Sequence, residues 1–122
     1  MPELPVSAGS LAIAVSDLAL EPGDLDPATV IEGTPQVSER LVWESPDGRI
    51  SRGVWQITPG VVTVVEADEL FVVISGRATI EIEDGPTLDV GPGDLCVLQR
   101  GARTVWRVHE TLRKVFQITS EA

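Results

Sequence analysis

The segment from residue 60 to residue 76 constrains the fold more than any other part of the chain. It reads GVVTVVEADELFVVISG, which is two runs of mostly β-branched and apolar residues bounded by glycines. Such runs are typical of β-strands. Only Ala67 and Asp68 separate the runs 61–66 and 69–75. We therefore predict two strands joined by a two-residue hairpin.

This hairpin would place Glu66 and Glu69 opposite each other on one face, with Val64 opposite Phe71 behind them. Two carboxylates would then stand at the end of an otherwise apolar face. Charged groups there are costly unless water, a metal ion or a cation reaches them. The pattern indicates a candidate site at Glu66 and Glu69; the alternative is an acidic turn that is simply solvated.

Short alternating or apolar runs, separated by turn residues such as Asp84-Gly85, cover most of the remaining chain. We predict further strands at 39–44, 50–58, 77–83, 87–90, 95–99, 103–108 and 113–119, and a short strand followed by a turn within 11–20. Many short strands with Gly/Pro punctuation favour an all-β sandwich or barrel. We expect one domain, with an N-terminal arm at 1–40 and a barrel core at 41–119.

Alternation in the last two predicted strands indicates which side chains point inward. Thr104 and Trp106 fall on the apolar face of 103–108, whereas Arg103 and Arg107 fall on the other. In 113–119 the bulky residues Phe116 and Ile118 share a face with Lys114. We place that face inward, where Lys114 would be held by a carboxylate or have a lowered pKa; the alternative is a surface lysine whose ammonium reaches solvent.

Charge and cysteine content exclude several classes of function. The chain of 122 residues carries a formal net charge of −10, from 9 basic and 19 acidic residues. This balance disfavours nucleic acids and anionic membranes as partners. Cys96, in the run LCVL, is predicted to be a buried, inert thiol, and His109 a turn or surface residue. With no signal segment and no long apolar span in the sequence, we expect a cytoplasmic location.

The spacing of glycines and acidic residues resembles the cupin family. The first cupin motif runs Gly, five residues, His-x-His, a spacer, Glu, six residues, Gly; here five residues separate Gly60 from Glu66-Ala67-Asp68, and Glu69 precedes Gly76 by six. The second motif runs Gly, five residues, Pro-x-Gly, two residues, His. The corresponding stretch here is Gly93, five residues, Gln99-Arg100-Gly101, two residues, Thr104, with the typical Pro-Gly-Asp at 92–94.

More narrowly, the chain resembles the small single-domain cupins related to (S)-ureidoglycine aminohydrolase. The matching features are Gly53-Val54-Trp55, Pro59-Gly60, Asp68-Glu69, the Pro-Gly-Asp at 92–94, Gly101 with Trp106, and Arg113-Lys114 before Phe116. The resemblance covers residues 43–118 and implies a single-domain cupin barrel, also described as a double-stranded β-helix or jelly roll. It also implies a homodimer, for which a strand within 11–20 would offer a sheet edge.

The metal ligands of the family are largely replaced. A metal-binding cupin uses three histidines and one glutamate, and those positions here are Glu66, Asp68, Glu69 and Thr104. We therefore expect no tightly bound cofactor. The alternative is a divalent metal ion held weakly by Glu66, Asp68 and Glu69 with water.

Together these features favour a small-molecule-binding cupin with an acidic interior pocket. Glu66, Glu69 and Lys114 are the catalytic candidates, and Trp55, Phe71, Thr104 and Trp106 the substrate-binding candidates. The resemblance implies hydrolysis or proton transfer on a small ureido or amino-acid-like metabolite. Two alternatives stay open: a non-catalytic structural or regulatory module whose barrel is filled by its own side chains, and a metal-dependent enzyme that uses the acidic cluster.

Overall fold

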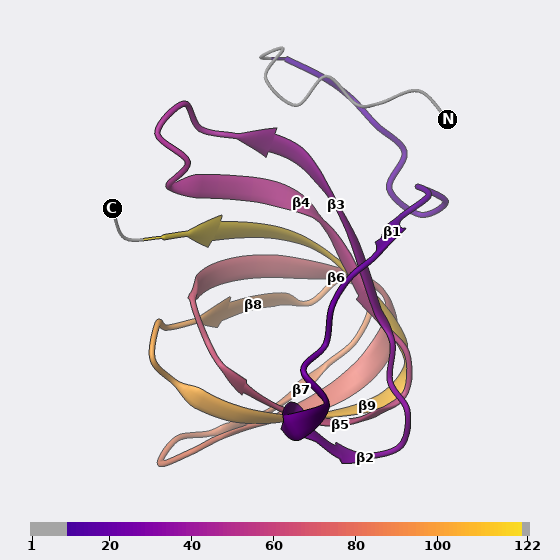
Figure 1. Ribbon diagram of the computed structural model, residues 1–122, viewed down its shortest axis with the longest axis vertical. Helices are drawn as coiled ribbons and strands as arrows, with labels where there is room; N and C mark the ends of the chain where they lie inside the picture. The colour runs from indigo at the N-terminus through magenta and orange to yellow at the C-terminus, as the bar shows by residue number, and fades with distance from the viewer. Residues whose placement is uncertain (1–9, 121–122) are drawn as a thin grey trace.

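A computed structural model describes residues 10–120 and shows an antiparallel sheet that curls into a barrel (Figure 1). Its elements are β1 (Glu21–Pro22), the 3₁₀ turn η1 (Pro27–Thr29), β2 (Val30–Glu32), β3 (Val37–Glu44), β4 (Ile50–Ile57), β5 (Gly60–Val65), β6 (Asp68–Ile82), β7 (Thr87–Val90), β8 (Leu95–Leu98) and β9 (Arg103–Thr119). The all-β prediction is confirmed. No helix within the described residues is long and apolar enough to cross a membrane.

Two long strands, β6 and β9, connect the two sides of the barrel. The first half of β6 lies between β8 and the second half of β9, which also pairs with β4. The second half of β6 lies between β7 and the first half of β9, which also pairs with β5. Each long strand therefore belongs to both sides, and Figure 1 shows them bending around the interior.

The bend in β6 occurs at Gly76. The β6–β9 register shifts between Val73 and Ala78, as at β-bulges where strands turn a corner. Gly76 has φ +86° there, in the left-handed region, and a Cβ on this residue would overlap the backbone of Thr111 and Leu112. Only glycine combines this conformation with so close an approach of two strands.

The predicted hairpin between 61–66 and 69–75 is wrong. β5 pairs with β9 and β2, whereas β6 pairs with β7, β8 and β9, so Glu66 and Glu69 are not cross-strand neighbours. A type I′ hairpin needs positive φ at both central residues. Asp84, in the hairpin between β6 and β7, is the only non-glycine residue with positive φ between 10 and 120, so Ala67 and Asp68 do not adopt that turn.

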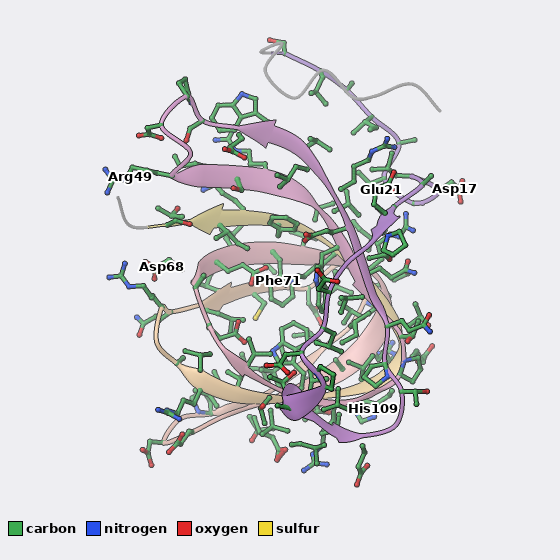
Figure 2. The ribbon with its side chains drawn as sticks, in the orientation of Figure 1. Asp17, Glu21, Arg49, Asp68, Phe71 and His109 are labelled. Carbon is green, nitrogen blue, oxygen red and sulfur yellow. The ribbon has the colours of Figure 1, made fainter. Side chains whose placement is uncertain are left out.

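The inward faces nevertheless agree with the sequence pattern. Val62, Phe71, Val73, Ile80 and Trp106 are all buried in one continuous core. Figure 2 shows Phe71 pointing into the centre of the barrel. Face assignments follow from the two-residue period of each strand and do not depend on which strand is its partner.

The strand expected within 11–20 is absent, and this stretch is irregular with a turn at Ser16 and Asp17. The reason is a side-chain clamp: Nη1 of Arg113 donates to the carbonyl oxygens of Val15, Ser16 and Leu18, at 2.8, 3.1 and 2.9 Å. These carbonyls converge on one guanidinium instead of alternating along a ladder. β1, β2 and the start of β3 lie within the segment 1–40 that we predicted as an arm.

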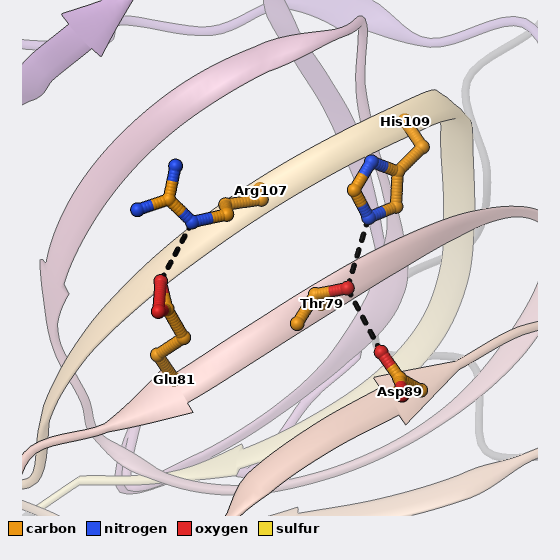
Figure 3. Close-up of polar contacts among 5 residues, drawn as sticks. All are labelled: Thr79, Glu81, Asp89, Arg107 and His109. Atoms are coloured by element: carbon orange, nitrogen blue, oxygen red, sulfur yellow. Dashed lines mark hydrogen bonds and ion pairs between the residues drawn. The ribbon is translucent and has the colours of Figure 1, made fainter.

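The outer surface of the described residues carries paired polar groups and exposed apolar side chains. Arg107 donates to Glu81 at 2.7 Å, and exposed His109 contacts Thr79, which donates to Asp89 (Figure 3). The surface prediction for His109 is confirmed, although it lies within β9 rather than in a turn.

On β8, which pairs only with β6 in the described part of the chain, Leu95 and Val97 are largely exposed. Exposed apolar patches often mark interaction sites. The homodimer itself stays a prediction.

Substitution of Gly76 tests the corner. Gly76→Ala should lower the free energy of unfolding by more than about 4 kcal/mol, because it adds a backbone overlap to an unfavourable φ. Gly101→Ala is the matched control, since Gly101 has φ +85° and no atom lies within 4 Å of the position that a Cβ would take there. It should cost only about 1–2 kcal/mol. Equal losses for the two variants in urea denaturation would contradict this account of the corner.

Candidate functional site

A cavity of about 270 Å³ opens into the barrel where residues 66 and 67 connect β5 to β6. Its lining residues are Glu39, Trp55, Val64, Val65, Glu66, Ala67, Glu69, Trp106, Lys114, Phe116 and Ile118. The walls are mainly apolar, and three of the four charged side chains, those of Glu66, Glu69 and Lys114, are buried. Burial of so many charges in one small space requires specific partners for each.

Lys114 lies at the centre of the buried charges. Its register neighbours are Trp55 on β4 and Val73 on β6, which place its side chain on the inner face. The ammonium nitrogen is 4.5 Å from the ring centre of Trp55, 4.4 Å from that of Phe71 and 5.1 Å from that of Trp106. Three aromatic faces therefore stabilise the cation through their quadrupoles.

Glu69 is the ion-pair partner of Lys114. The ammonium donates to Oε2 of Glu69 at 2.5 Å, and the side chains of Glu69 and Lys114 are only 5% and 6% exposed. Burial raises the pKa of the Glu69 carboxyl above its ordinary value; Lys114 opposes this effect and the negative charge of Glu66 adds to it. Glu66 thus affects Glu69 electrostatically although the two residues are not cross-strand neighbours.

Glu66 is held by neutral donors. Its Oε2 accepts hydrogen bonds from the Thr104 hydroxyl at 2.7 Å and from the Trp106 indole nitrogen at 3.0 Å. Glu66 is 5% exposed, and neither donor carries a charge. Thr104 and Trp106 are inward neighbours on β9, so alternation along one strand supplies both donors.

One oxygen of each buried carboxylate is left to the cavity. The side-chain hydrogen bonds of Glu66 and Glu69 within residues 10–120 all end at Oε2. No fully buried side-chain nitrogen or oxygen in this range lacks a partner. The Oε1 atoms are therefore accessible from the cavity, where a bound molecule or water can donate to them.

The structure brings together most of the residues selected from the sequence. Trp55, Trp106 and Lys114 line the cavity with the two glutamates. Phe71 and Thr104 do not line the cavity themselves. The ring of Phe71 contacts the Lys114 ammonium, and the hydroxyl of Thr104 donates a hydrogen bond to Glu66. Asp68 is separate: it is exposed, accepts the backbone N–H of Arg100 at 2.9 Å, and points outward in Figure 2.

Sequence reasoning missed Glu39 and did not select Phe116 and Ile118 as cavity walls. Glu39 is directly opposite Trp55 in the β3–β4 register, so it lies at the mouth. The register of the β3–β4 hairpin could have identified Glu39, because a residue directly opposite an inward-pointing tryptophan lies on the same face of the sheet as that tryptophan. We had placed Phe116 and Ile118 inward. Because they alternate along β9 on the same face as Lys114, the sequence could also have identified them as lining residues of the cavity.

A family model, the EutQ-like cupin domain, matches residues 44–116, which is more than half of the chain. The chain belongs to this family. No curated protein sequence matches this cupin domain.

Solved structures agree with the assignment. A Pseudomonas syringae pv. tomato protein of unknown function from the DUF861 family is 28% identical with a TM-score of 0.77, over 84% of this chain. This chain spans only 45% of that protein. The Clostridium difficile EutQ protein is 16% identical with a TM-score of 0.60, over 80% of this chain and 81% of its own. At this identity the likeness to EutQ shows the fold alone, and it is the predicted cupin barrel.

The residues of this cupin domain do not fit a metal ion in the family manner. Glu69, at the position that keeps the family ligand type, is already paired with the ammonium of Lys114. The hydroxyl of Thr104 donates to Glu66, and Asp68 lies outside the cavity. The described residues contain no group of three His, Cys, Asp or Glu side chains that could hold a metal ion. A divalent ion would have to displace the cation that now neutralises Glu69.

Two other features of the domain are weaker candidates for a functional site. A larger hollow of about 610 Å³ lies beside Arg103 and Arg107, but its Arg107 pairs with Glu81 and both are exposed. We therefore place the candidate site at the smaller cavity, which contains the buried charges. Cys96 is buried, and burial raises the pKa of its thiol to about 11. A thiol in this state is a poor nucleophile at neutral pH.

Removal of Lys114 tests the electrostatics of the cavity. Lys114→Met should lower the free energy of unfolding by about 3 kcal/mol at neutral pH, because Glu69 stays buried without a counter-charge. The loss should shrink as the pH falls from neutrality towards the ordinary pKa of a glutamate carboxyl. Burial already raises the pKa of Glu69, and without Lys114 nothing opposes it. A group with a raised folded pKa contributes stability that is present below its unfolded pKa and is lost as the pH rises through the folded value.

Urea denaturation across this pH range measures the effect, and Arg107→Met is the matched control. Arg107 forms a comparable pair with Glu81, but the side chains are 46% and 40% exposed. Its loss should cost less than about 1 kcal/mol. A pH-independent loss in Lys114→Met would show that the lysine contributes only packing.

Proposed function

We propose that this cupin domain binds a small polar organic molecule in the interior cavity. The observation that carries the proposal is the pair of carboxylate oxygens, one from Glu66 and one from Glu69, that face the cavity without a protein donor. Carboxylate oxygens that face a cavity are normally satisfied by a ligand or by ordered water. Apolar walls with a few convergent polar groups are typical of small-molecule sites.

The size of the cavity favours ligand binding over a barrel filled by its own side chains. At about 30 Å³ for each water molecule, the cavity corresponds to roughly nine such volumes. That is room for a metabolite of up to about ten non-hydrogen atoms. The aromatic residues of the interior pack around Lys114 and leave this space open at its mouth.

The same groups supply the elements of acid–base chemistry. Burial raises the pKa of Glu69 above its ordinary value, a direction that suits a group that accepts and returns a proton, and Lys114 beside it carries further protons. We include in the proposal the activity implied by the resemblance to ureidoglycine aminohydrolase, hydrolysis or proton transfer on a ureido or amino-acid-like metabolite. The proposed reaction and substrate class are supported by the residues at the cavity and by that resemblance.

Ligand binding can be measured at the three tryptophan side chains. Trp55 and Trp106 line the cavity, whereas Trp43 lies elsewhere, under the guanidinium of Arg52. In ¹⁵N NMR spectra, titration with small ureido and amino compounds should shift the indole N–H signal of Trp106, which donates to Glu66. The Trp43 signal should stay in place and acts as the internal control. If no compound moves the Trp106 signal, or if all three signals move together, binding in the cavity is contradicted.

Elemental analysis tests the metal-dependent alternative. Protein purified without a tag or a chelator should contain transition metal well below one equivalent, because Lys114 already neutralises Glu69 and Thr104 is bonded to Glu66. A near-stoichiometric metal content that survives dialysis would contradict this expectation and would make Glu66 and Glu69 ligands. Lys114→Met is the informative variant, because removal of the ammonium should raise the affinity of the cavity for added Mg²⁺ or Mn²⁺.

A further inference from the structure

The buried charges of the cavity point to the chemical class of its ligand; this inference rests on the proposed function. We propose that the cavity selects a small organic cation that can donate hydrogen bonds, such as a guanidinium, an amidinium or a primary ammonium, and that Glu66 is the group that recognises it. The same arrangement disfavours quaternary ammonium ions and ligands that offer only a neutral urea or a carboxylate; a ureido or amino-acid-like metabolite would be recognised through its primary ammonium group.

Charge balance supports a cationic ligand. The buried charged side chains at the cavity are two carboxylates, Glu66 and Glu69, and one ammonium, Lys114. Lys114 is bonded to Glu69, which leaves Glu66 with only the neutral donors Thr104 and Trp106. A buried carboxylate without a counter-charge is strongly unfavourable. Exposed Glu39 at the mouth adds a further negative charge, which attracts cations and repels anions.

The Lys114 ammonium already occupies the aromatic faces of the cavity, and this favours cations that donate hydrogen bonds over quaternary ammonium ions. Aromatic boxes commonly bind quaternary ammonium groups through cation–π interactions. Here the faces of Trp55, Phe71 and Trp106 already surround the Lys114 ammonium at 4.4 to 5.1 Å. A ligand cation must therefore be recognised by hydrogen bonds to carboxylate oxygens, for which a guanidinium or primary ammonium has donors and a quaternary ammonium has none.

The free oxygens favour a ligand with more than one donor. Oε1 of Glu66 and Oε1 of Glu69 face the same cavity and lack protein donors. A guanidinium or amidinium presents parallel N–H groups that can serve one carboxylate or bridge two. Its planar apolar faces also suit the aliphatic wall formed by Val64 and Ile118.

Isosteric probe pairs separate charge from shape. Methylguanidinium and methylurea have the same heavy-atom framework, as do acetamidinium and acetamide, and only the first of each pair is charged at neutral pH. We expect methylguanidinium to bind at least about tenfold more tightly than methylurea, because hydrogen bonds to charged groups are the stronger ones. Titrations follow the Trp106 indole N–H signal, with tetramethylammonium chloride as the non-donor cation and sodium chloride as the ionic-strength control.

Matched glutamine variants test the role of Glu66. Glu66→Gln should weaken methylguanidinium binding by about tenfold or more and leave the weak binding of methylurea unchanged. Glu81→Gln makes the same chemical change at an exposed ion pair with Arg107 and should alter neither. If Glu66→Gln does not fold, the probe pairs on the wild-type protein still decide the question.

Each outcome has one meaning. Tight binding of the donor cations, with loss in Glu66→Gln, supports the inference. If neutral or anionic probes shift the Trp106 signal as strongly as the cations do, the cavity binds ligands but the cationic class is wrong. If tetramethylammonium binds as tightly as methylguanidinium, the aromatic faces are available and the donor requirement is overturned. If no probe in the panel shifts the signal, the proposed function and this inference both fail.

Discussion

The pairing of β6 with β9 is the constraint on which the rest of this cupin domain depends. Each strand runs through both sides of the barrel, so one antiparallel ladder, interrupted by bulges, fixes the position of every other strand. β4 and β5 attach to β9, and β7 and β8 attach to β6. The bend at Gly76 closes the two halves over a shared interior, and that closure makes the cavity. A residue with a side chain at this position would force the strands apart before any site could form.

Closure of the barrel also explains why charged residues lie inside it. Glu66 follows the end of β5, Glu69 is at the start of β6, and Lys114 comes from the second half of β9. None of the three is a register neighbour of another, yet all converge on one space. Their positions are set by long backbone ladders, which are stable enough to impose buried charges on the core. The cost of those charges is offset by the ion pair, by the aromatic faces and by the donors of Thr104 and Trp106.

The sequence was a good guide to faces and a poor guide to partners. Alternation correctly placed Thr104, Trp106 and Lys114 inside, because the side-chain period of a strand is independent of its neighbours. We predicted a hairpin between β5 and β6 because two residues are long enough for a turn. The prediction was wrong because a two-residue turn also needs positive φ, and neither Ala67 nor Asp68 adopts it. In contrast, Asp84, next to Gly85, does adopt positive φ, and the hairpin between β6 and β7 formed there. Pairings such as β5 with β9 span about forty residues, and local patterns carry no information about them.

The same distinction applies to the site. Glu66 and Glu69 were selected because carboxylates on an apolar face demand a partner, and this physical argument did not require the correct pairing. The sequence could not predict which partner each glutamate would have, because that depends on distances between side chains across the closed barrel. Lys114 neutralises Glu69 and sits among the aromatic rings, whereas Glu66 receives two neutral hydrogen bonds. This asymmetry converts a general expectation of an acidic pocket into a specific one: among the described residues the cavity holds two buried carboxylates and one buried ammonium, and the carboxylate without a positive partner is Glu66.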